Sequence, residues 1–283
     1  MTRALRTVLD GLAFGEAPRW RDGRLYFSDM HAHEVVAVTP DGARETIVTS
    51  PTAVSGLGWL PDGRMLVVSM DDRKLMRLEA DGRLAEHADL SDIATFHPND
   101  MVVDAQGRAY VGNFGFPLYP RGETKAAKLA RVDPDGAVHE AADGLIFPNG
   151  AVISPDGKTL VVGETFAGRM TAFDVAPDGG LSNRRVWAAL PQGAVPDGCC
   201  LDAEGAIWVA SPTTNDVIRL HEGGEVSERI DTGRGAFACM LGGDDRRTLF
   251  MLIADGSDPE KSARTRTASI VATEVNVPGA GLP

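Results

Sequence analysis

One short pattern of residues recurs six times along this chain of 283 residues. Each copy has a small or polar stretch, an apolar strand, a tight turn typified by Asp-Gly, and a second apolar strand. The copies begin close to Glu16, Ser55, Pro98, Pro148, Pro196 and Phe237. A spacing of roughly 40–50 residues is the length of one four-stranded propeller blade. Because an isolated hairpin cannot bury its apolar face, such repeated units must stack on one another.

The repeat predicts an all-β protein, a six-bladed β-propeller with four-stranded antiparallel blades, in which residues 1–283 form a single domain. Aliphatic and aromatic residues reach 43% of the chain, enough for the packed core of such a ring. Helical periodicity is almost absent, and β-branched apolar runs supply the third and fourth strands. These expected strands are Val35–Val38, Thr46–Thr49, Leu75–Glu79, Lys128–Val132, Met170–Val175, Val217–Leu220 and Ser269–Val277.

The N-terminal segment is expected to close the ring. The chain ends in Pro278-Gly-Ala-Gly-Leu-Pro, which is too short and too rich in Gly and Pro for a fourth strand of the last blade. Ala4–Leu9, in contrast, precedes the first inner strand just as Arg44–Thr49 precedes the second. Ala4–Leu9 should therefore be the outer strand of the last blade, where it removes an exposed sheet edge.

Charge and cysteine content narrow the partners and the compartment. A net charge of −12 disfavours nucleic acid and anionic membranes as partners. No apolar run approaches the length of a membrane span, and the N-terminus lacks the apolar segment of a secretory signal. Cys199, Cys200 and Cys239 are an odd number without repeated spacing, so we expect reduced thiols and a cytoplasmic protein. These features do not indicate an oligomeric state.

Four of the six expected inner strands begin with a residue that can bind a cation. In a propeller these beginnings share one face, and the Asp-Gly turns share the other. The four residues occupy equivalent positions, so radial symmetry should point them into one central mouth: Glu16, Asn99, Asn149 and Asp197. Without a cation, the carboxylates of Glu16 and Asp197 would repel each other there.

Carboxylate and amide oxygens without a thiolate are the ligands that a hard cation selects. The sequence therefore predicts a divalent metal at Glu16, Asn99, Asn149 and Asp197. Ca²⁺ fits this ligand set best, with Mg²⁺, Mn²⁺ and Zn²⁺ as alternatives. A second interpretation is that Pro148-Asn-Gly and Pro196-Asp-Gly are ordinary turn tripeptides between blades. That interpretation weakens because four blades carry such a residue at the same place.

Two long loops should border a substrate entrance on this face. Residues 114–119 follow a second strand in the third blade, and 255–266 do so in the sixth. Long loops over a cavity commonly act as lids or specificity walls. The candidate substrate-binding residues are Met30, His97, Asn99, Phe114, Phe116 and Tyr119. His97 has two interpretations, either a contact with the substrate or a solvated position on the rim. Asp29 and Glu164 are interpreted as residues that cap loops.

Four motifs from the first to the fifth blade together resemble a known family. They are Gly15-Glu16-Ala-Pro-Arg-Trp, Pro98-Asn99-Asp100, Phe147-Pro-Asn149-Gly and Val195-Pro-Asp197-Gly. Their joint order is similar to the senescence marker protein/gluconolactonase/luciferin-regenerating-enzyme group, the regucalcin-like lactonases. This resemblance implies a six-bladed propeller in which the residues matching Glu16, Asn149 and Asp197 bind a divalent metal. It further implies that Asn99 lies beside metal and substrate, and that Asp197 is the general base.

One position departs from the pattern of that group. Its sugar lactonases often carry Arg two residues before the third-blade Asn, where this chain has His97. Together with the Phe-rich loop, this leaves room for a more apolar lactone or ester.

We predict a metal-dependent hydrolase, a lactonase that opens a small lactone through a polarised carbonyl and a water activated by Asp197. The alternatives are another ester hydrolase, a hydratase or an isomerase on the same site, and a non-catalytic calcium-binding propeller.

Overall fold

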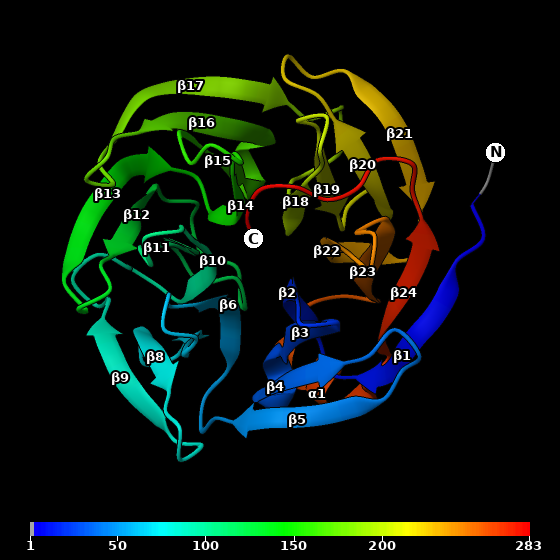
Figure 1. The fold of residues 1–283 in the computed structure, drawn as a ribbon, viewed down its shortest axis with the longest axis horizontal. Coiled ribbons are helices and arrows are strands. Elements are labelled where there is room, and N and C mark those ends of the chain that lie inside the picture. The colour runs from blue at the N-terminus through cyan, green and yellow to red at the C-terminus, as the bar shows by residue number, and fades with distance from the viewer. Residues whose placement is uncertain (1–2) are drawn as a thin grey trace.

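Six four-stranded antiparallel sheets stand around a common axis in the computed structural model, which describes residues 3–283 (Figure 1). The prediction of a six-bladed β-propeller is confirmed. Blade 1 contains β2 (Gly15–Arg21), β3 (Arg24–Asp29), β4 (Glu34–Val38) and β5 (Arg44–Thr49). Blade 2 contains β6 (Val54–Trp59), β7 (Met65–Ser69), β8 (Lys74–Leu78) and β9 (Leu84–Asp89). Blade 3 contains β10 (Pro98–Val103), β11 (Ala109–Asn113), β12 (Ala127–Val132) and β13 (Val138–Leu145).

The second half of the ring repeats this arrangement. Blade 4 contains β14 (Pro148–Ile153), β15 (Thr159–Glu164), β16 (Arg169–Val175) and β17 (Leu181–Ala189). Blade 5 contains β18 (Cys199–Leu201), β19 (Ile207–Ser211), β20 (Asp216–Leu220) and β21 (Val226–Asp231). Blade 6 contains β22 (Gly235–Gly242), β23 (Thr248–Ala254), β24 (Ala268–Glu274) and β1 (Arg6–Leu12).

The N-terminal strand closes the ring, as expected. β1 pairs antiparallel with β24, from Arg6 opposite Ala272 to Leu12 opposite Ala268. The strand lies a little later in the chain than Ala4–Leu9, and β24 ends at Glu274. Because the last blade takes its outer strand from the other end of the chain, opening the ring requires breaking the β1–β24 ladder.

The C-terminal tail adds a second tie that the sequence does not predict. Ala280 N donates to the carbonyl of Leu201 at 3.0 Å, and Leu282 and Ile153 exchange backbone hydrogen bonds of 3.1 and 2.9 Å. Ala203, in the tight turn of blade 5, donates to the carbonyl of Pro278 at 2.8 Å. The tail therefore crosses the turn-bearing face and ends near the centre of the ring (Figure 1).

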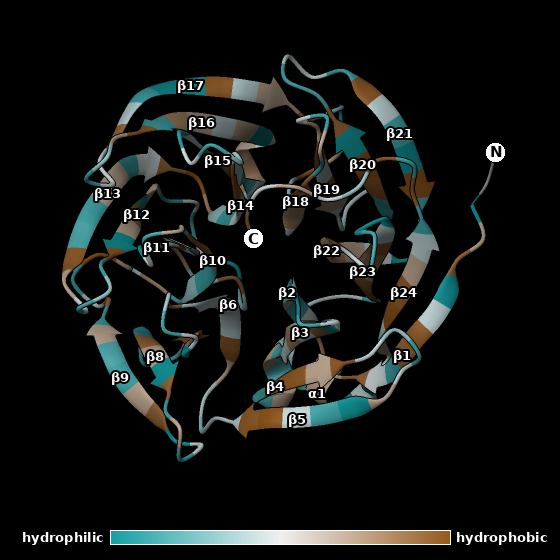
Figure 2. Cartoon of the chain, in the orientation of Figure 1, coloured by the Kyte–Doolittle hydropathy of each residue, from teal (hydrophilic) through white to brown (hydrophobic). Residues whose placement is uncertain are grey.

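Large side chains fill the space between neighbouring blades. Trp20 of blade 1 stacks on Phe250 of blade 6, with ring centroids 5.5 Å apart. Trp208 and Tyr110 are 1% exposed. The outermost strands carry both teal and brown segments in Figure 2, and most of their residues are exposed or half-buried, whereas the inner strands β10 and β14 are buried throughout. The packed core therefore lies between the sheets, in a ring around the axis.

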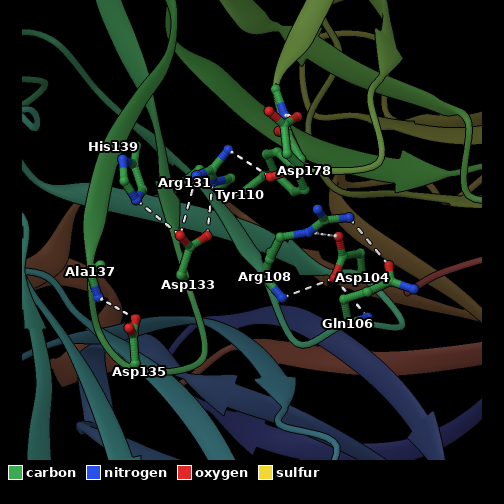
Figure 3. Close-up of polar contacts among 12 residues, drawn as sticks. Asp104, Gln106, Arg108, Tyr110, Arg131, Asp133, Asp135, Ala137, His139 and Asp178 are labelled. Atoms are coloured by element: carbon green, nitrogen blue, oxygen red, sulfur yellow. Dashed lines mark hydrogen bonds and ion pairs between the residues drawn. The ribbon is translucent and has the colours of Figure 1, made fainter.

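Buried ion pairs reinforce the turn-bearing face between blades 3 and 4 (Figure 3). Arg108 donates through Nε to Asp104 at 2.6 Å and through Nη1 to the carbonyl of Pro177 in blade 4 at 2.8 Å. Tyr110 Oη donates to the carbonyl of Gly179 at 2.9 Å, and burial raises the pKa of this phenol to about 12. These bonds fix one blade against the next.

Helical structure is confined to three short segments among residues 3–283: η1 (Met30–Ala32), η2 (Thr165–Ala167) and α1 (Pro259–Thr265). α1 lies within the long loop of blade 6, and Asp258 caps it by accepting from Lys261 N at 2.8 Å. Pro259 at the first turn suits a helix start. In the described part of the chain, no helix is both long and apolar enough to cross a membrane.

Candidate active site

Irregularities in the inner strands aim the four candidate ligands. The pairing register shifts directly after Glu16 in β2, around Asn99 in β10 and around Asn149 in β14. A β-bulge of this kind re-aims a side chain that would otherwise follow the regular alternation between the two faces. Asp197 lies two residues before β18, and its N–H donates to the carbonyl of Ala210 in β19 at 3.0 Å. All four side chains line one cavity at the end of the ring opposite the tight turns.

Backbone strain accompanies two of these positions. Ala17, which follows Glu16, has φ of 47°, and Phe147, which precedes Pro148 and Asn149, has φ of 57°. A non-glycine residue in the left-handed region costs about 1–3 kcal/mol, and such residues gather at functional sites. The strained backbone places the Glu16 carboxylate within reach of its own neighbour, since Ala17 N donates to Glu16 Oε2 at 3.2 Å.

Asn149 and Asp197 form a hydrogen-bonded pair. Asn149 Nδ2 donates to Asp197 Oδ1 at 2.6 Å and to Thr165 Oγ1 at 3.1 Å. The Thr165 hydroxyl in turn donates to the carbonyl of Pro196 at 2.9 Å. Thr165, the first residue of η2, therefore fixes the amide orientation from a neighbouring loop. Because Nδ2 is used in these bonds, the Asn149 carbonyl oxygen is left to accept from, or coordinate, a ligand.

Asn99 is held by a residue of the preceding blade. Ser55 Oγ in β6 donates to Asn99 Oδ1 at 3.2 Å, and both side chains are buried. Ser55 therefore orients the Asn99 amide from blade 2.

Burial and mutual repulsion disfavour the ionised forms of the two carboxylates. Glu16 is 6% exposed and Asp197 is 8% exposed. Burial raises the pKa of Glu16 well above its usual range, and the charges of Asp197 and Asp100 raise it further. Burial likewise raises the pKa of Asp197 to about 8, although the hydrogen bond from Asn149 opposes the shift. A cation between the two groups would remove this penalty.

A buried ion pair lies beneath the cluster. Arg19 Nη2 contacts Asp100 Oδ1 at 2.6 Å, and Arg19 Nε donates to the carbonyl of Leu57 at 3.0 Å. Asp100 Oδ1 also accepts from Met101 N at 2.8 Å, so this carboxylate turns toward the backbone. The pairing with Arg19 was not expected. It engages Asp100 and leaves Glu16 and Asp197 without a paired Lys or Arg among the described residues.

A cavity of about 680 Å³ opens above these side chains. Eight of the nine sequence-predicted site residues line it: Glu16, Met30, His97, Asn99, Phe114, Tyr119, Asn149 and Asp197. Phe116 does not line it. This ring is 1% exposed and packs against two rings that line the cavity. Its centroid lies 5.9 Å from that of Phe147 and 5.6 Å from that of Phe166.

Both long loops reach the cavity and meet across its mouth. Tyr119 Oη, from the blade 3 loop, lies 2.7 Å from Ser257 Oγ in the blade 6 loop. His31 Nε2 lies 3.3 Å from the carbonyl of Ser257. Asp29 and Glu164 act as loop caps, as expected, because they accept from Phe14 N at 2.8 Å and Ile146 N at 2.9 Å.

The His97 ring has a defined orientation on the cavity rim. Nδ1 lies 3.1 Å from the carbonyl of Met70 and 3.7 Å from Asp71 Oδ1. A carbonyl can only accept, so Nδ1 carries the hydrogen and Nε2 is the ring's acceptor. The ring also contacts Phe96 edge to face, with centroids 4.2 Å apart.

Residues 14–255 match the SMP-30/Gluconolactonase/LRE-like region. The chain belongs to this family. A 6-deoxy-6-sulfogluconolactonase of Pseudomonas putida is 27% identical over 278 residues, which are 95% of this chain and 94% of that protein. A pentonolactonase of Haloferax volcanii is 27% identical over 289 residues, 98% and 96% of the two chains. The solved structure of regucalcin from Agrobacterium tumefaciens, described as a calcium-binding protein, superposes with a TM-score of 0.83, at 23% identity and over 100% and 97% of the chains.

Family membership confirms the resemblance drawn from the motifs, and the lactonases among the relatives confirm the prediction of a lactonase-like enzyme.

The donor set of the cavity floor also fits a divalent cation of the hard class. Across residues 3–283, no three His, Cys, Asp or Glu side chains are grouped to hold a metal. A cation here would therefore take the two carboxylates of Glu16 and Asp197 with amide oxygens. Two negative charges and neutral oxygens suit Ca²⁺.

Proposed function

We propose that this protein is a divalent-cation-dependent lactone hydrolase, with Ca²⁺ held by Glu16, Asn99, Asn149 and Asp197. The observation that carries the proposal is the pair of buried carboxylates at the cavity floor, whose pKa values are raised by burial and repulsion. Arg19 is paired with Asp100, and its charge only partly offsets the raised pKa of Glu16. The lactonases among the relatives support lactones as the substrate class.

The cation, when bound, would polarise the lactone carbonyl and stabilise the oxyanion that develops on it. Asp197 is the proposed general base, which takes a proton from water as its oxygen attacks the carbonyl carbon. The ring C–O bond then breaks, and Asp197 returns the proton to the leaving oxygen. Asn149 and Thr165 position Asp197 through the hydrogen bonds of 2.6 and 3.1 Å.

The test is hydrolysis of a lactone panel by the full-length protein, stripped with a chelator and then reloaded. We expect hydrolysis to vanish with the cation and to return with Ca²⁺, with Mg²⁺, Mn²⁺ and Zn²⁺ as comparison ions. Undiminished hydrolysis in excess chelator would contradict the cation dependence. Tight cation binding by calorimetry without hydrolysis of any lactone would instead support the non-catalytic calcium-binding propeller.

A further inference from the structure

Phenylalanine rings form one continuous wall of the cavity. Phe114 stacks on Phe147, with ring centroids 4.3 Å apart and planes at 23°. Phe166 meets Phe147 edge to face at 5.1 Å, and Phe96 lies 6.4 Å from Phe114. These four rings line the cavity, and Phe116 supports them from behind. The wall extends over blades 3 and 4 and the segment before blade 3, and its central ring, Phe147, contacts Phe114, Phe116 and Phe166.

A second aromatic wall comes from blades 1 and 6. Phe14 and Phe237 meet edge to face with centroids 4.7 Å apart, and His31 stacks on Phe14 at 5.1 Å. All three residues line the same cavity. The two walls are contributed by different sides of the ring, and the carboxylate cluster lies at the floor. A bound molecule would therefore place its reacting carbonyl at the floor and the rest of its surface among phenylalanine rings.

The charged lining residues are all acidic apart from the histidines. Glu16, Asp71, Asp197 and Glu260 contribute carboxylates, and the lining residues in the described part of the chain include no Lys or Arg. Arg121 stacks on Phe166, 4.3 Å from the ring centroid, but is not a lining residue. Such a cavity disfavours an anionic substituent, because phosphate, sulfonate and carboxylate groups are recognised by Arg and Lys.

Several polar groups that line the cavity already have hydrogen-bond partners within the protein. Tyr119 Oη bonds to Ser257 Oγ, and His97 Nδ1 faces the carbonyl of Met70. Thr165 is used by Asn149 and the carbonyl of Pro196. A polyhydroxylated ring would have to compete for these groups, and any of its hydroxyls that faced the phenylalanine rings would be unpaired, which is costly for a buried hydroxyl.

We propose that the substrate is a neutral lactone bearing an aliphatic or aromatic substituent, which packs between the two phenylalanine walls, and not a sugar lactone or an anionic lactone. This inference rests on the proposed lactone hydrolysis and names its substrate class. A volume of about 680 Å³ suits a small molecule with such a substituent.

Three δ-lactones with the same ring size separate the possibilities: δ-decalactone, δ-gluconolactone and 6-phosphogluconolactone, each assayed with the cation-loaded protein. We expect kcat/KM for δ-decalactone to exceed that for either sugar lactone by at least about a hundredfold, since each packed methylene contributes roughly tenfold. Equal or faster hydrolysis of a sugar lactone would overturn the substrate class and leave the proposed hydrolysis intact.

Variants of the wall provide a second readout. Phe114→Ala should lower kcat/KM for δ-decalactone by at least about tenfold, mainly through KM, while the larger Phe114→Leu side chain restores part of it. Val186→Ala removes an apolar side chain that is 58% exposed on β17, outside the cavity, and should leave both values unchanged. An equal loss for δ-gluconolactone in Phe114→Ala would contradict recognition by the wall.

Binding of lactams tests the inference apart from the chemistry, because a lactam resists hydrolysis. Calorimetry should show a pentyl-substituted δ-lactam binding at least about tenfold more tightly than gluconolactam, with the preference lost in Phe114→Ala. If the lactam preference holds but no lactone is hydrolysed, the binding class is supported and the proposed function fails. If neither lactam binds more tightly than the other, the inference is wrong whatever the hydrolysis shows.

Discussion

At the scale of single residues, the two carboxylates of the floor differ in their partners. Asp197 Oδ1 accepts the 2.6 Å hydrogen bond of Asn149, which holds the carboxylate in one orientation. Glu16 contacts only the N–H of its own neighbour Ala17 among the hydrogen bonds of residues 3–283. The oriented group is the better candidate for proton transfer, and the more loosely held group is the better candidate for a pure ligand.

Replacing Asp197 with Asn separates these roles. Asn keeps the size and an oxygen ligand but loses basicity, so Asp197→Asn should still bind the cation while turnover falls on the order of 10²–10⁴-fold. Lactone hydrolysis and calorimetry on the same sample measure both effects. Asp72→Asn, at an exposed position of blade 2, is the matched control and should change neither. Near-normal turnover in the cation-loaded Asp197→Asn protein would move the base elsewhere, with His97 the next candidate.

Glu16→Gln removes one of the two carboxylate charges of the proposed cation site while keeping the length of the side chain. Cation affinity should fall at least about tenfold, because charge count is a principal determinant of Ca²⁺ affinity. Titration calorimetry with Ca²⁺ measures the change, again with Asp72→Asn as the control. An unchanged affinity would show that Glu16 is not a ligand.

The sequence could locate the candidate ligands but not the groups that hold them. Asn99 and Asp197 could be placed because the repeat puts each at the start of an inner strand. Ser55, Thr165 and Arg19 could not, because each contacts a residue outside its own blade through hydrogen bonds that no periodicity encodes. The one signal for Arg19 was a basic residue within an otherwise buried strand.

At the scale of elements, side-chain caps tie the loops to the blades. Glu164, at the end of β15, is fully buried and accepts from Ile146 N at 2.9 Å, Arg169 Nε at 2.8 Å and Thr171 Oγ1 at 2.5 Å. Burial opposes its ionisation, but the hydrogen bonds from Arg169, Thr171 and Ile146 outweigh burial and lower the pKa of Glu164 below its usual range. The cap therefore joins three segments of blade 4 in its charged form.

Acid should weaken this cap in a predictable direction. The folded-state pKa of Glu164 is lower than the unfolded one, so its contribution to stability is complete above the unfolded pKa and is lost as pH falls through the folded pKa. Glu164→Gln should lower the unfolding free energy at pH 7 by about 2 kcal/mol and flatten its fall with acid. Urea unfolding from pH 7 to pH 3 measures both.

Glu140→Gln is the control for that measurement, because Glu140 forms a half-exposed pair with Lys128 in blade 3. Its effect at pH 7 should stay below about 1 kcal/mol. If the unfolding free energy falls with acid at the same slope in the wild type and in Glu164→Gln, the Glu164 cap does not carry the pH dependence.

At the scale of the whole molecule, two chain termini hold the ring together. The clasp of β1 on β24 follows from strand counting, and the sequence therefore predicts it. The C-terminal tail has no periodicity and is rich in Gly and Pro, and its partners Ile153 and Leu201 lie far away in the sequence. Its path could be found only in three dimensions, although its composition correctly excluded a fourth strand.

The tail should contribute to stability without contributing to the site. Gly281 has φ of 68°, and a Cβ there would lie 2.5 Å from the carbonyl oxygen of Ile153, the acceptor of the Leu282 hydrogen bond. Gly281→Ala should therefore displace the tail and lower the unfolding free energy by about 2–4 kcal/mol, from the strained backbone and the lost hydrogen bonds together. Gly157→Ala shares the strain, with φ of 70°, but its Cβ would meet nothing within 4 Å. The difference between the two variants in urea unfolding isolates the tail.

Because Ile153 and Leu201 lie at the turn-bearing face, Ca²⁺ affinity and lactone hydrolysis should be unchanged in folded Gly281→Ala protein. Equal stabilities of the two variants would show that the tail is not a tie, and a loss of Ca²⁺ affinity would show that it is coupled to the opposite face.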